Sequence, residues 1–287
     1  MPHIVLKGPL LRRRLFPEGD AHVSADVDVL VAPGAWQNAE AALGRLGFEP
    51  LLLDIIPGDR PNHARPYAHA AGGPAVDLHR TLLGAEAEPE VVWPALQAEA
   101  EAALLGDVEV TVLALPAQLL HVALHAAQNG RENERTTRYL ARCLEVADPA
   151  TSIRALRLAT EIGATDAFAL GLSLAPAGRE LSRELGIAPR PTVTMALRAT
   201  SAPNTAHALE WLATRASFRE RARFVLHKAF PPRAYMASSY PGVRTRTGLV
   251  LSYPARWLWL ARELPSSLRV LRQARAASNG SQPVEKG

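Results

Sequence analysis

The N-terminal third of the chain alternates between short apolar runs and segments with helical spacing. Residues 3–8 are an apolar run that ends in a glycine, and Pro9 opens a short segment suited to a helix. Residues 25–33 alternate polar and apolar side chains with period two, which predicts a strand. Residues 34–47 place apolar side chains three or four positions apart and end in a glycine, which predicts a helix.

Three later segments add further strands to this pattern. Residues 48–56 and residues 75–82 are apolar runs that predict a third and a fourth strand. The segment between them, residues 57–74, is rich in Pro, Gly, Asn and Asp and predicts a loop. Residues 109–116 predict one more strand.

Helical spacing dominates the rest of the chain. The predicted helices span residues 89–105, 116–129, 134–147, 151–162, 204–228 and 254–275. The order of elements predicts an α+β protein. We expect a small mixed sheet in residues 1–115, a helical domain in residues 116–277 and a disordered tail in residues 278–287.

Composition is that of an ordinary globular protein. Hydrophobic residues make up 48% and charged residues 21% of the 287 positions. The single cysteine, Cys143, excludes an internal disulfide framework and a multi-cysteine metal site. The first residues lack the order of a secretory signal, and no apolar run approaches the ~20 residues that span a bilayer. We therefore expect a cytoplasmic protein with no transmembrane segment.

Charge is distributed unevenly along the chain. Residues 1–189 hold 16 basic and 24 acidic residues, whereas residues 190–287 hold 16 basic and 4 acidic residues. A C-terminal part with a net charge of +12 would attract polyanions such as RNA or an anionic membrane. Arginines that simply occupy surface positions would give the same excess of basic residues, and this alternative stays open.

Two acids stand one residue apart in the otherwise apolar strand of residues 25–33. Asp26 and Asp28 project to the same side of that strand, because alternate residues share a face. Two close carboxylates repel each other, and a divalent cation between them relieves the repulsion. Asp77 has the same setting in the fourth predicted strand. An exposed polar strand face is the structural alternative.

A glycine turn precedes this acidic strand. Lys7 and Gly8 lie between the first strand and the helix that begins at Pro9. Such a turn offers backbone N–H groups to a phosphate, and Lys7 adds a positive charge. A phosphate-binding turn and metal-binding acids would then lie close together.

These residues resemble the nucleotidyltransferases of the DNA polymerase β superfamily. Their pattern is a glycine turn that enters a helix, an acid–apolar–acid strand and a third acid on a later strand. The stretches "IVLKGPLL", "DVDVLV" and "VDLHRTLLG" are more closely similar to an uncharacterised bacterial nucleotidyltransferase family. Helical stretches such as "LLHVALHAAQNG" extend the resemblance, more weakly, over most of the chain.

The resemblance implies a nucleotidyltransferase-like sheet domain followed by a helical acceptor-binding domain. It implies that Asp26 and Asp28 bind two Mg²⁺ ions and that Asp77 completes the ligand set and helps to deprotonate the acceptor. Lys7 and Gly8 would bind the triphosphate of ATP or another NTP, with Pro9 in the turn and Arg12 within reach. All three acids would be catalytic.

Two positions depart from the family pattern. The usual Gly-Ser turn is here Gly8-Pro9, which removes a hydroxyl and a backbone donor. His22 stands where relatives tend to have an arginine, four residues before the first acid. These departures motivate an alternative function, a non-catalytic nucleotide- or RNA-binding module on the same fold.

The leading expectation is a Mg²⁺-dependent enzyme that moves an NMP from an NTP to a hydroxyl or phosphate acceptor. The acceptor itself is unknown. A small molecule, a peptide or a protein is favoured, with RNA as the second choice through the basic C-terminal half.

Several histidines and a basic segment leave alternatives open. His79 shares the face of Asp77 and would lie near the metals or the substrate. His121 and His125 lie one helical turn apart and are either packing residues or part of a pocket. Residues 215–233 carry arginines at helical spacing among phenylalanines, as in an RNA- or lipid-facing helix or an ordinary amphipathic one.

Overall fold

The computed structural model describes residues 1–16, 26–51, 63–190, 192–214, 217–233, 236 and 246–280. The chain forms two compact units. One contains Met1–Leu51 and Pro61–Pro191, and the other contains the chain from Thr192 onward. Helices that follow the last strand, up to residue 191, therefore belong to the same unit as the sheet. The functional division expected at residue 116 stays a prediction.

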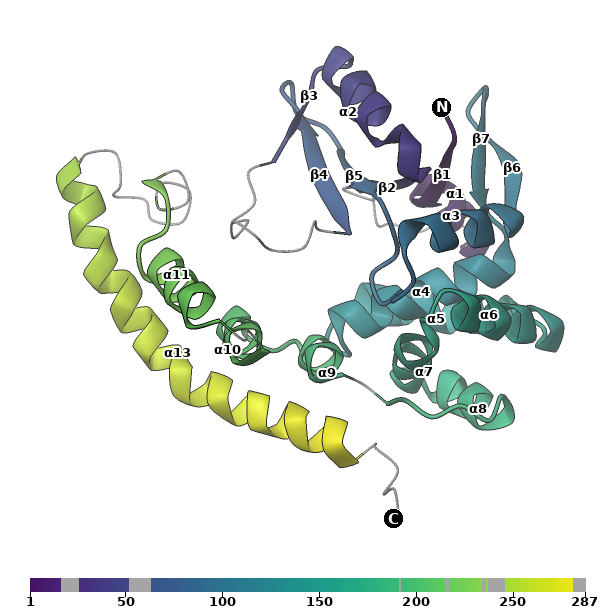
Figure 1. Ribbon diagram of the computed structural model, residues 1–287. Helices are drawn as coiled ribbons and strands as arrows, with labels where there is room; N and C mark the ends of the chain where they lie inside the picture. The colour runs from purple at the N-terminus through teal and green to yellow at the C-terminus, as the bar shows by residue number, and fades with distance from the viewer. Residues whose placement is uncertain are drawn as a thin grey trace. The chain divides into compact units, whose positions relative to one another are not determined.

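A seven-stranded mixed sheet forms the centre of the first unit (Figure 1). Its strands, in spatial order, are β3 (Phe48–Pro50), β4 (Ala64–His69), β5 (Ala75–His79), β2 (Asp26–Val31), β1 (His3–Lys7), β7 (Val108–Leu113) and β6 (Ala100–Leu105). The pairs β2–β5 and β1–β7 are parallel, and the other neighbours are antiparallel. The prediction of an α+β fold with a mixed sheet is confirmed.

Helices make up most of the remaining structure (Figure 1). The first unit contains α1 (Pro9–Leu15), the 3-10 helix η1 (Pro33–Ala35), α2 (Trp36–Arg45), α3 (Pro89–Ala98), α4 (Leu115–Asn129), α5 (Glu134–Val146), α6 (Pro149–Glu161), α7 (Thr165–Ser173) and α8 (Pro176–Glu184). The second unit contains α9 (Val193–Ala199), α10 (Asn204–Thr214), α11 (Phe218–Ala229) and α13 (Arg246–Gly280).

The central strands have two chemically different faces. On one face, alternate residues of β2 and β5 pack against α2 in a cluster that includes Val31, Trp36 and Leu78. Because side chains alternate along a strand, the intervening residues Asp28 and Asp77 point to the opposite face. The acids therefore lie on the face opposite the α2 cluster, and buried apolar residues such as Leu30 share that face with them.

Helix α4 is the most deeply buried helix of the first unit among the described residues. It packs against α5, α6 and α7. Its approach to α7 requires a glycine, because a Cβ at Gly171 would lie 2.0 Å from the carbonyl oxygen of Ala123. Helices α4 and α7 therefore pack with their backbones in close contact at this position.

Two segments that the sequence predicted as a helix end and as a loop form strands in the structure. Residues 100–105, predicted as the end of a helix, form β6 and pair with β7 through the two-residue turn at Gly106 and Asp107. Glycine suits this turn because Gly106 has a φ of 62°. Residues 64–69, predicted as a loop, form β4, whose Tyr67 is buried in the core. Tertiary pairing overrides the helix propensity of the alanine-rich segment and the turn signals around Pro66.

Other boundaries also differ from the predictions. Of the third predicted strand, residues 48–50 form β3, and residues 52–56 lie outside the described residues. Residues 204–228 form two helices instead of one. Helices α7, α8 and α9 were not predicted. Helix α13 is longer than residues 254–275 and includes residues 278–280 of the expected tail.

The second unit has its own small core, formed where α9, α10 and α13 meet. Its buried residues are Ala196, Leu197, Ala206, Leu271 and Ala274. Across the helices that the structure describes, none combines the length and the apolar character needed to cross a membrane.

Candidate active site

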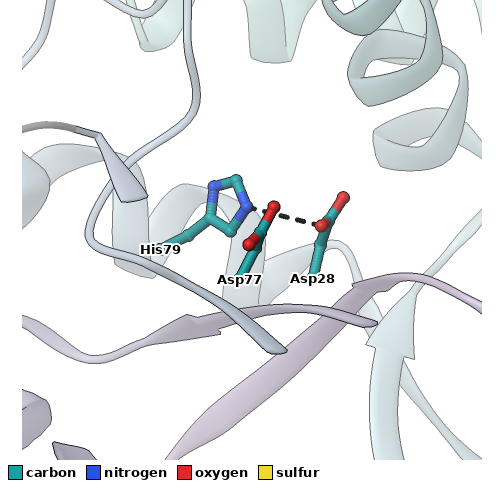
Figure 2. A group of neighbouring side chains, drawn as sticks. All are labelled: Asp28, Asp77 and His79. Atoms are coloured by element: carbon teal, nitrogen blue, oxygen red, sulfur yellow. Dashed lines mark ion pairs between the residues drawn. The ribbon is translucent and has the colours of Figure 1, made fainter. Parts of the chain in front are cut away.

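The parallel pairing of β2 with β5 brings two predicted site residues side by side. Asp28 and Asp77 are direct partners in the register of these strands. Figure 2 shows both carboxyl groups on the same face of the sheet. Asp26 lies two residues before Asp28 on β2, so its side chain leaves the same face. All three predicted acids therefore belong to one face.

His79 joins this group from β5. Its Nε2 atom lies 3.8 Å from Oδ1 of Asp28. One ligand atom from each of Asp28, Asp77 and His79 falls within 4.8 Å of the others. The sequence placed His79 on this face but did not predict it as a metal ligand. The signal was its position two residues after Asp77 on a strand.

Lys7 reaches the acidic face because the β1–β2 ladder is irregular. Val5 pairs with Val29, and strict alternation would pair Lys7 with Val27 on the apolar side. A register shift between Val5 and Lys7 instead places Lys7 opposite Asp28. Such bulges redirect side chains next to functional sites.

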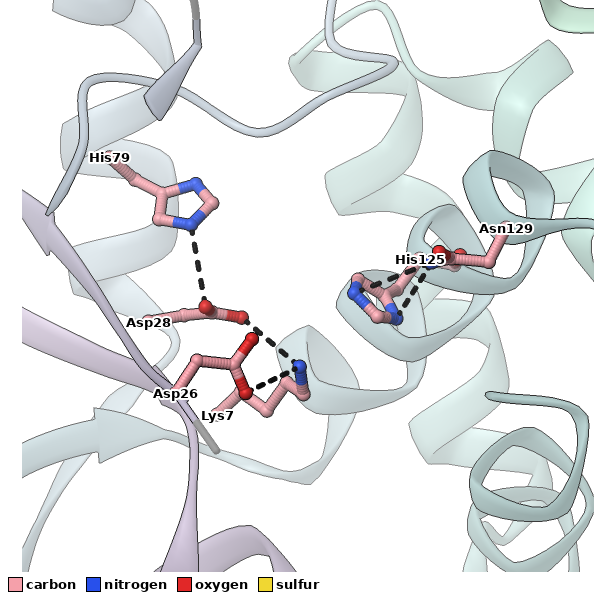
Figure 3. Close-up of polar contacts among 6 residues, drawn as sticks. All are labelled: Lys7, Asp26, Asp28, His79, His125 and Asn129. Atoms are coloured by element: carbon pink, nitrogen blue, oxygen red, sulfur yellow. Dashed lines mark hydrogen bonds and ion pairs between the residues drawn. The ribbon is translucent and has the colours of Figure 1, made fainter. Parts of the chain in front are cut away.

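The Lys7 ammonium forms two ion pairs in this position. Its Nζ lies 3.6 Å from Oδ1 of Asp26 and 3.7 Å from Oδ2 of Asp28, as Figure 3 shows. The lysine thus places a cation between the two carboxylates that were predicted to share a metal ion.

The two paired aspartates have opposite electrostatic character. Burial raises the pKa of the Asp28 carboxyl, but the electrostatic effect of the nearby His79 ring and the charge of Lys7 outweigh it, and the net pKa is lowered. Burial raises the pKa of Asp77, and the negative charge of Asp28 raises it further. Asp28 is therefore held as the anion, whereas Asp77 binds a proton more readily.

Two imidazoles of α4 face the same site. Burial lowers the pKa of His121 to about 4 and that of His125 to about 3. Both rings are close enough for Asp28 and Lys7 to influence their pKa values. The Nε2 atom of His121 is buried and has no hydrogen-bond partner among the described residues. These histidines are thus neutral polar groups at pH 7.

The predicted phosphate-binding turn lies at the end of β1. Gly8 has a φ of 137°, a region that favours glycine, and a Cβ there would still find space. Pro9 is the exposed first residue of α1, and Arg12 lies one turn further on, half-buried. Arg14 forms an ion pair with Glu101. His22 lies outside the described residues.

The residues on this face fit a divalent cation. Carboxylates are hard oxygen ligands suited to Mg²⁺, and the Lys7 ammonium already occupies a cation position between two of them. Both ring nitrogens of His79 are buried and lack a hydrogen-bond partner among the described residues. A bound cation would satisfy the carboxylates and one of these two nitrogens.

Paired acids on neighbouring strands, beside a glycine turn and a lysine, define a candidate phosphoryl- or nucleotidyl-transfer site. The profile of the uncharacterised nucleotidyltransferase family matches residues 1–177, and the chain belongs to this family. The match contains every site residue described above and supports nucleotidyl transfer as the general activity. The broader DNA polymerase β superfamily is consistent with it. A search of curated proteins found no match.

The second unit contains a separate apolar cavity of about 710 Å³. It lies among α10, α11 and α13 and includes Trp211, Phe224 and Trp259 in its lining. Phe224 stacks on Trp211 with ring centroids 4.1 Å apart, so this phenylalanine of the basic segment is a packing residue. Phe218 in the same segment is 84% exposed.

Proposed function

We propose that this protein is a Mg²⁺-dependent nucleotidyltransferase that moves an NMP from an NTP to a hydroxyl or phosphate acceptor. One observation carries the proposal: Asp28 and Asp77 are register partners on one sheet face, with Asp26 beside them and a glycine turn at the end of the neighbouring strand. The family match covers this entire arrangement.

The three aspartates would hold the metal in this proposal. Two Mg²⁺ ions at these carboxylates would neutralise charge on the entering and leaving oxygens of the reacting phosphate. Asp28 suits a permanent ligand role because its pKa is lowered. Asp77 suits a second role as proton acceptor for the attacking hydroxyl, because its pKa is raised toward the working range of a general base.

Lys7 would exchange partners during substrate binding. Without metal, its ammonium neutralises Asp26 and Asp28. If these carboxylates held a divalent ion, they would no longer need the Lys7 ammonium to neutralise them. Lys7 would then be available to the triphosphate, together with the backbone at Gly8. Arg12 on α1 is the next basic residue along the chain from this turn.

The acceptor would bind to the helical part of the chain, residues 116–277. Two neutral imidazoles of α4, His121 and His125, offer hydrogen bonds to an uncharged or anionic group. A small molecule, a peptide or a protein is our preferred acceptor. RNA is the second, because the C-terminal part is basic. We keep the cytoplasm as the proposed location.

Pro9 motivates the alternative function, a non-catalytic nucleotide- or RNA-binding module. Proline at the first position of α1 removes a backbone donor from the turn that would bind the triphosphate. In this alternative, nucleotide binding would not depend on metal bound by the acids.

Calorimetric titration with Mg-NTP separates the two functions. We expect Asp26→Asn and Asp28→Asn each to weaken metal-dependent nucleotide binding by about tenfold or more, since each removes a charged ligand. Asp107→Asn, in the exposed β6–β7 turn, is the matched control and should bind as the wild type does. Nucleotide binding that both site variants retain would favour the non-catalytic module.

Transfer itself is tested with each α-labelled NTP and Mg²⁺ in an extract of the source cells. Label in the small-molecule, protein or RNA fraction identifies the acceptor class. Absence of transfer with every nucleotide, by a protein that binds Mg-NTP, would refute the enzyme and leave the binding module.

A further inference from the structure

His79 is a buried imidazole on the acidic face. It is 8% exposed, and neither ring nitrogen has a hydrogen-bond partner within the part of the chain that the structure describes. Its nearest charged neighbour is Asp28, with 3.8 Å between Nε2 and Oδ1. Buried polar atoms normally have partners, so this imidazole indicates a ligand at the site.

The position of His79 suits metal coordination. Ligand atoms bonded to one metal ion at ~2.1 Å lie about 3 Å apart when they are adjacent. The His79–Asp28 separation of 3.8 Å exceeds this spacing by less than an ångström. The third ligand atom, from Asp77, lies within 4.8 Å of both. Figure 2 shows the three side chains converging from two adjacent strands.

A set of two carboxylates and one imidazole discriminates between metals. Mg²⁺ prefers oxygen ligands and keeps several waters, whereas imidazole is a favoured ligand of first-row transition metals. Three carboxylates alone would suit Mg²⁺. The addition of His79 changes that preference.

We propose that His79 is a metal ligand with Asp28 and Asp77, and that it makes this site prefer a first-row transition-metal dication to Mg²⁺. The inference rests on the proposed function in one respect, because the ion would lie at the carboxylates assigned there to Mg²⁺. It extends that function by naming the class of metal and the side chain that selects it.

Calorimetry on the metal-free, full-length protein measures the preference, with Co²⁺ and Mg²⁺ as probes. We expect the wild type to bind Co²⁺ at least about tenfold more tightly than Mg²⁺. His79→Gln should lose about 10- to 100-fold in Co²⁺ affinity, while its Mg²⁺ affinity changes less than about threefold. The control His3→Gln changes an imidazole at the start of the sheet, which within the described residues is hydrogen-bonded only to the Met1 carbonyl, and should keep the wild-type ratio.

Direct coordination of the metal by His79 has a spectroscopic signature that can be measured on the wild-type protein alone. In the proton NMR spectrum of the Co²⁺-bound wild type, an imidazole ligand should give a strongly shifted, exchangeable N–H resonance. The resonance should persist in His3→Gln and vanish in His79→Gln. Its absence from the wild type would overturn the proposal.

The remaining outcomes separate this inference from the proposed function. Equal losses of Co²⁺ and Mg²⁺ affinity in His79→Gln would overturn the inference and make His79 a residue that only positions Asp28. If Asp28→Asn abolishes Mg-NTP binding while His79→Gln keeps the Co²⁺/Mg²⁺ ratio, the proposed function stands and the metal preference fails. If the ratio falls in His79→Gln but no NTP binds to the wild type, the metal site stands and the nucleotidyl-transfer proposal fails.

Discussion

Replacement of Lys7 by methionine should strengthen metal binding and weaken nucleotide binding. Methionine keeps most of the length of the lysine side chain but removes its charge. The ammonium competes with any divalent ion for Asp26 and Asp28, because it pairs with both carboxylates. The same ammonium would contact the triphosphate once the metal is bound. The two expected effects therefore have opposite signs.

The magnitude follows from the two ion-pair distances. For charges 3.6 Å and 3.7 Å apart, Coulomb's law gives roughly 1 kcal/mol per pair in bulk water and roughly 4–5 kcal/mol at an effective dielectric of 20. Lys7 regains hydration when it is displaced, so we use the lower value. Two pairs of about 1 kcal/mol correspond to metal binding about 10- to 30-fold tighter in Lys7→Met.

Calorimetry measures both halves of this prediction. Mg²⁺ is titrated into the metal-free protein without nucleotide, and NTP is then titrated at saturating Mg²⁺. Loss of a charge-assisted hydrogen bond of about 1.5–3 kcal/mol should weaken NTP binding by roughly tenfold or more. Lys7→Arg keeps the charge and should retain weak metal binding. Unchanged or weaker metal binding in Lys7→Met would refute the idea that the ammonium competes with the ion.

Two further predictions concern Asp77 and the packing of α4. Asp77→Asn should abolish transfer yet raise the melting temperature of the metal-free protein by about 2 °C at pH 7–8, because the raised pKa of Asp77 shows that its ionised form is disfavoured beside Asp28. Because the pKa of Asp77 is higher in the folded than in the unfolded protein, its ionised carboxylate destabilises the fold fully above the folded-state pKa and not at all below the unfolded-state pKa. The difference in melting temperature between Asp77→Asn and the wild type should therefore vanish as the pH falls below about 4. A difference that persists in acid would contradict this cause. Gly171→Ala should destabilise the first unit by about 1–3 kcal/mol in urea unfolding, because its Cβ would lie 2.0 Å from the Ala123 carbonyl oxygen. Gly34→Ala, where an added Cβ meets nothing within 4 Å, is the control, and equal effects of both changes would exclude the steric explanation.

The elements that could be predicted are those with a strong local signal. Asp26 and Asp28 share a face because a strand repeats every two residues, whatever it pairs with. The helix of residues 134–147 was predicted from spacing alone and is capped by Asn133, whose side chain accepts a hydrogen bond from the Thr136 backbone N–H. Such features depend on neighbours in the sequence.

The strands β4 and β6 could not be predicted because their stability comes from partners distant in sequence. The segment of β6 consists of alanine and leucine with one glutamate, residues that favour helices in isolation. Pairing with β7 supplies backbone hydrogen bonds that a propensity argument does not contain. In the same way, Tyr67 of β4 is buried only because the core cluster of α2 and β5 lies beside it.

The sequence by itself determined the types of chemical group at the site and their local spacing: a lysine and glycine at a turn, two acids on one strand face, and an acid and a histidine on another. The tertiary structure alone decided that Asp28 and Asp77 are register partners, because register is a property of two strands together. It also decided that Lys7 faces the acids, through a register shift that strict alternation would not produce. The physical reason is that charge interactions depend on distances between chain segments far apart in sequence, and only the folded sheet sets those distances.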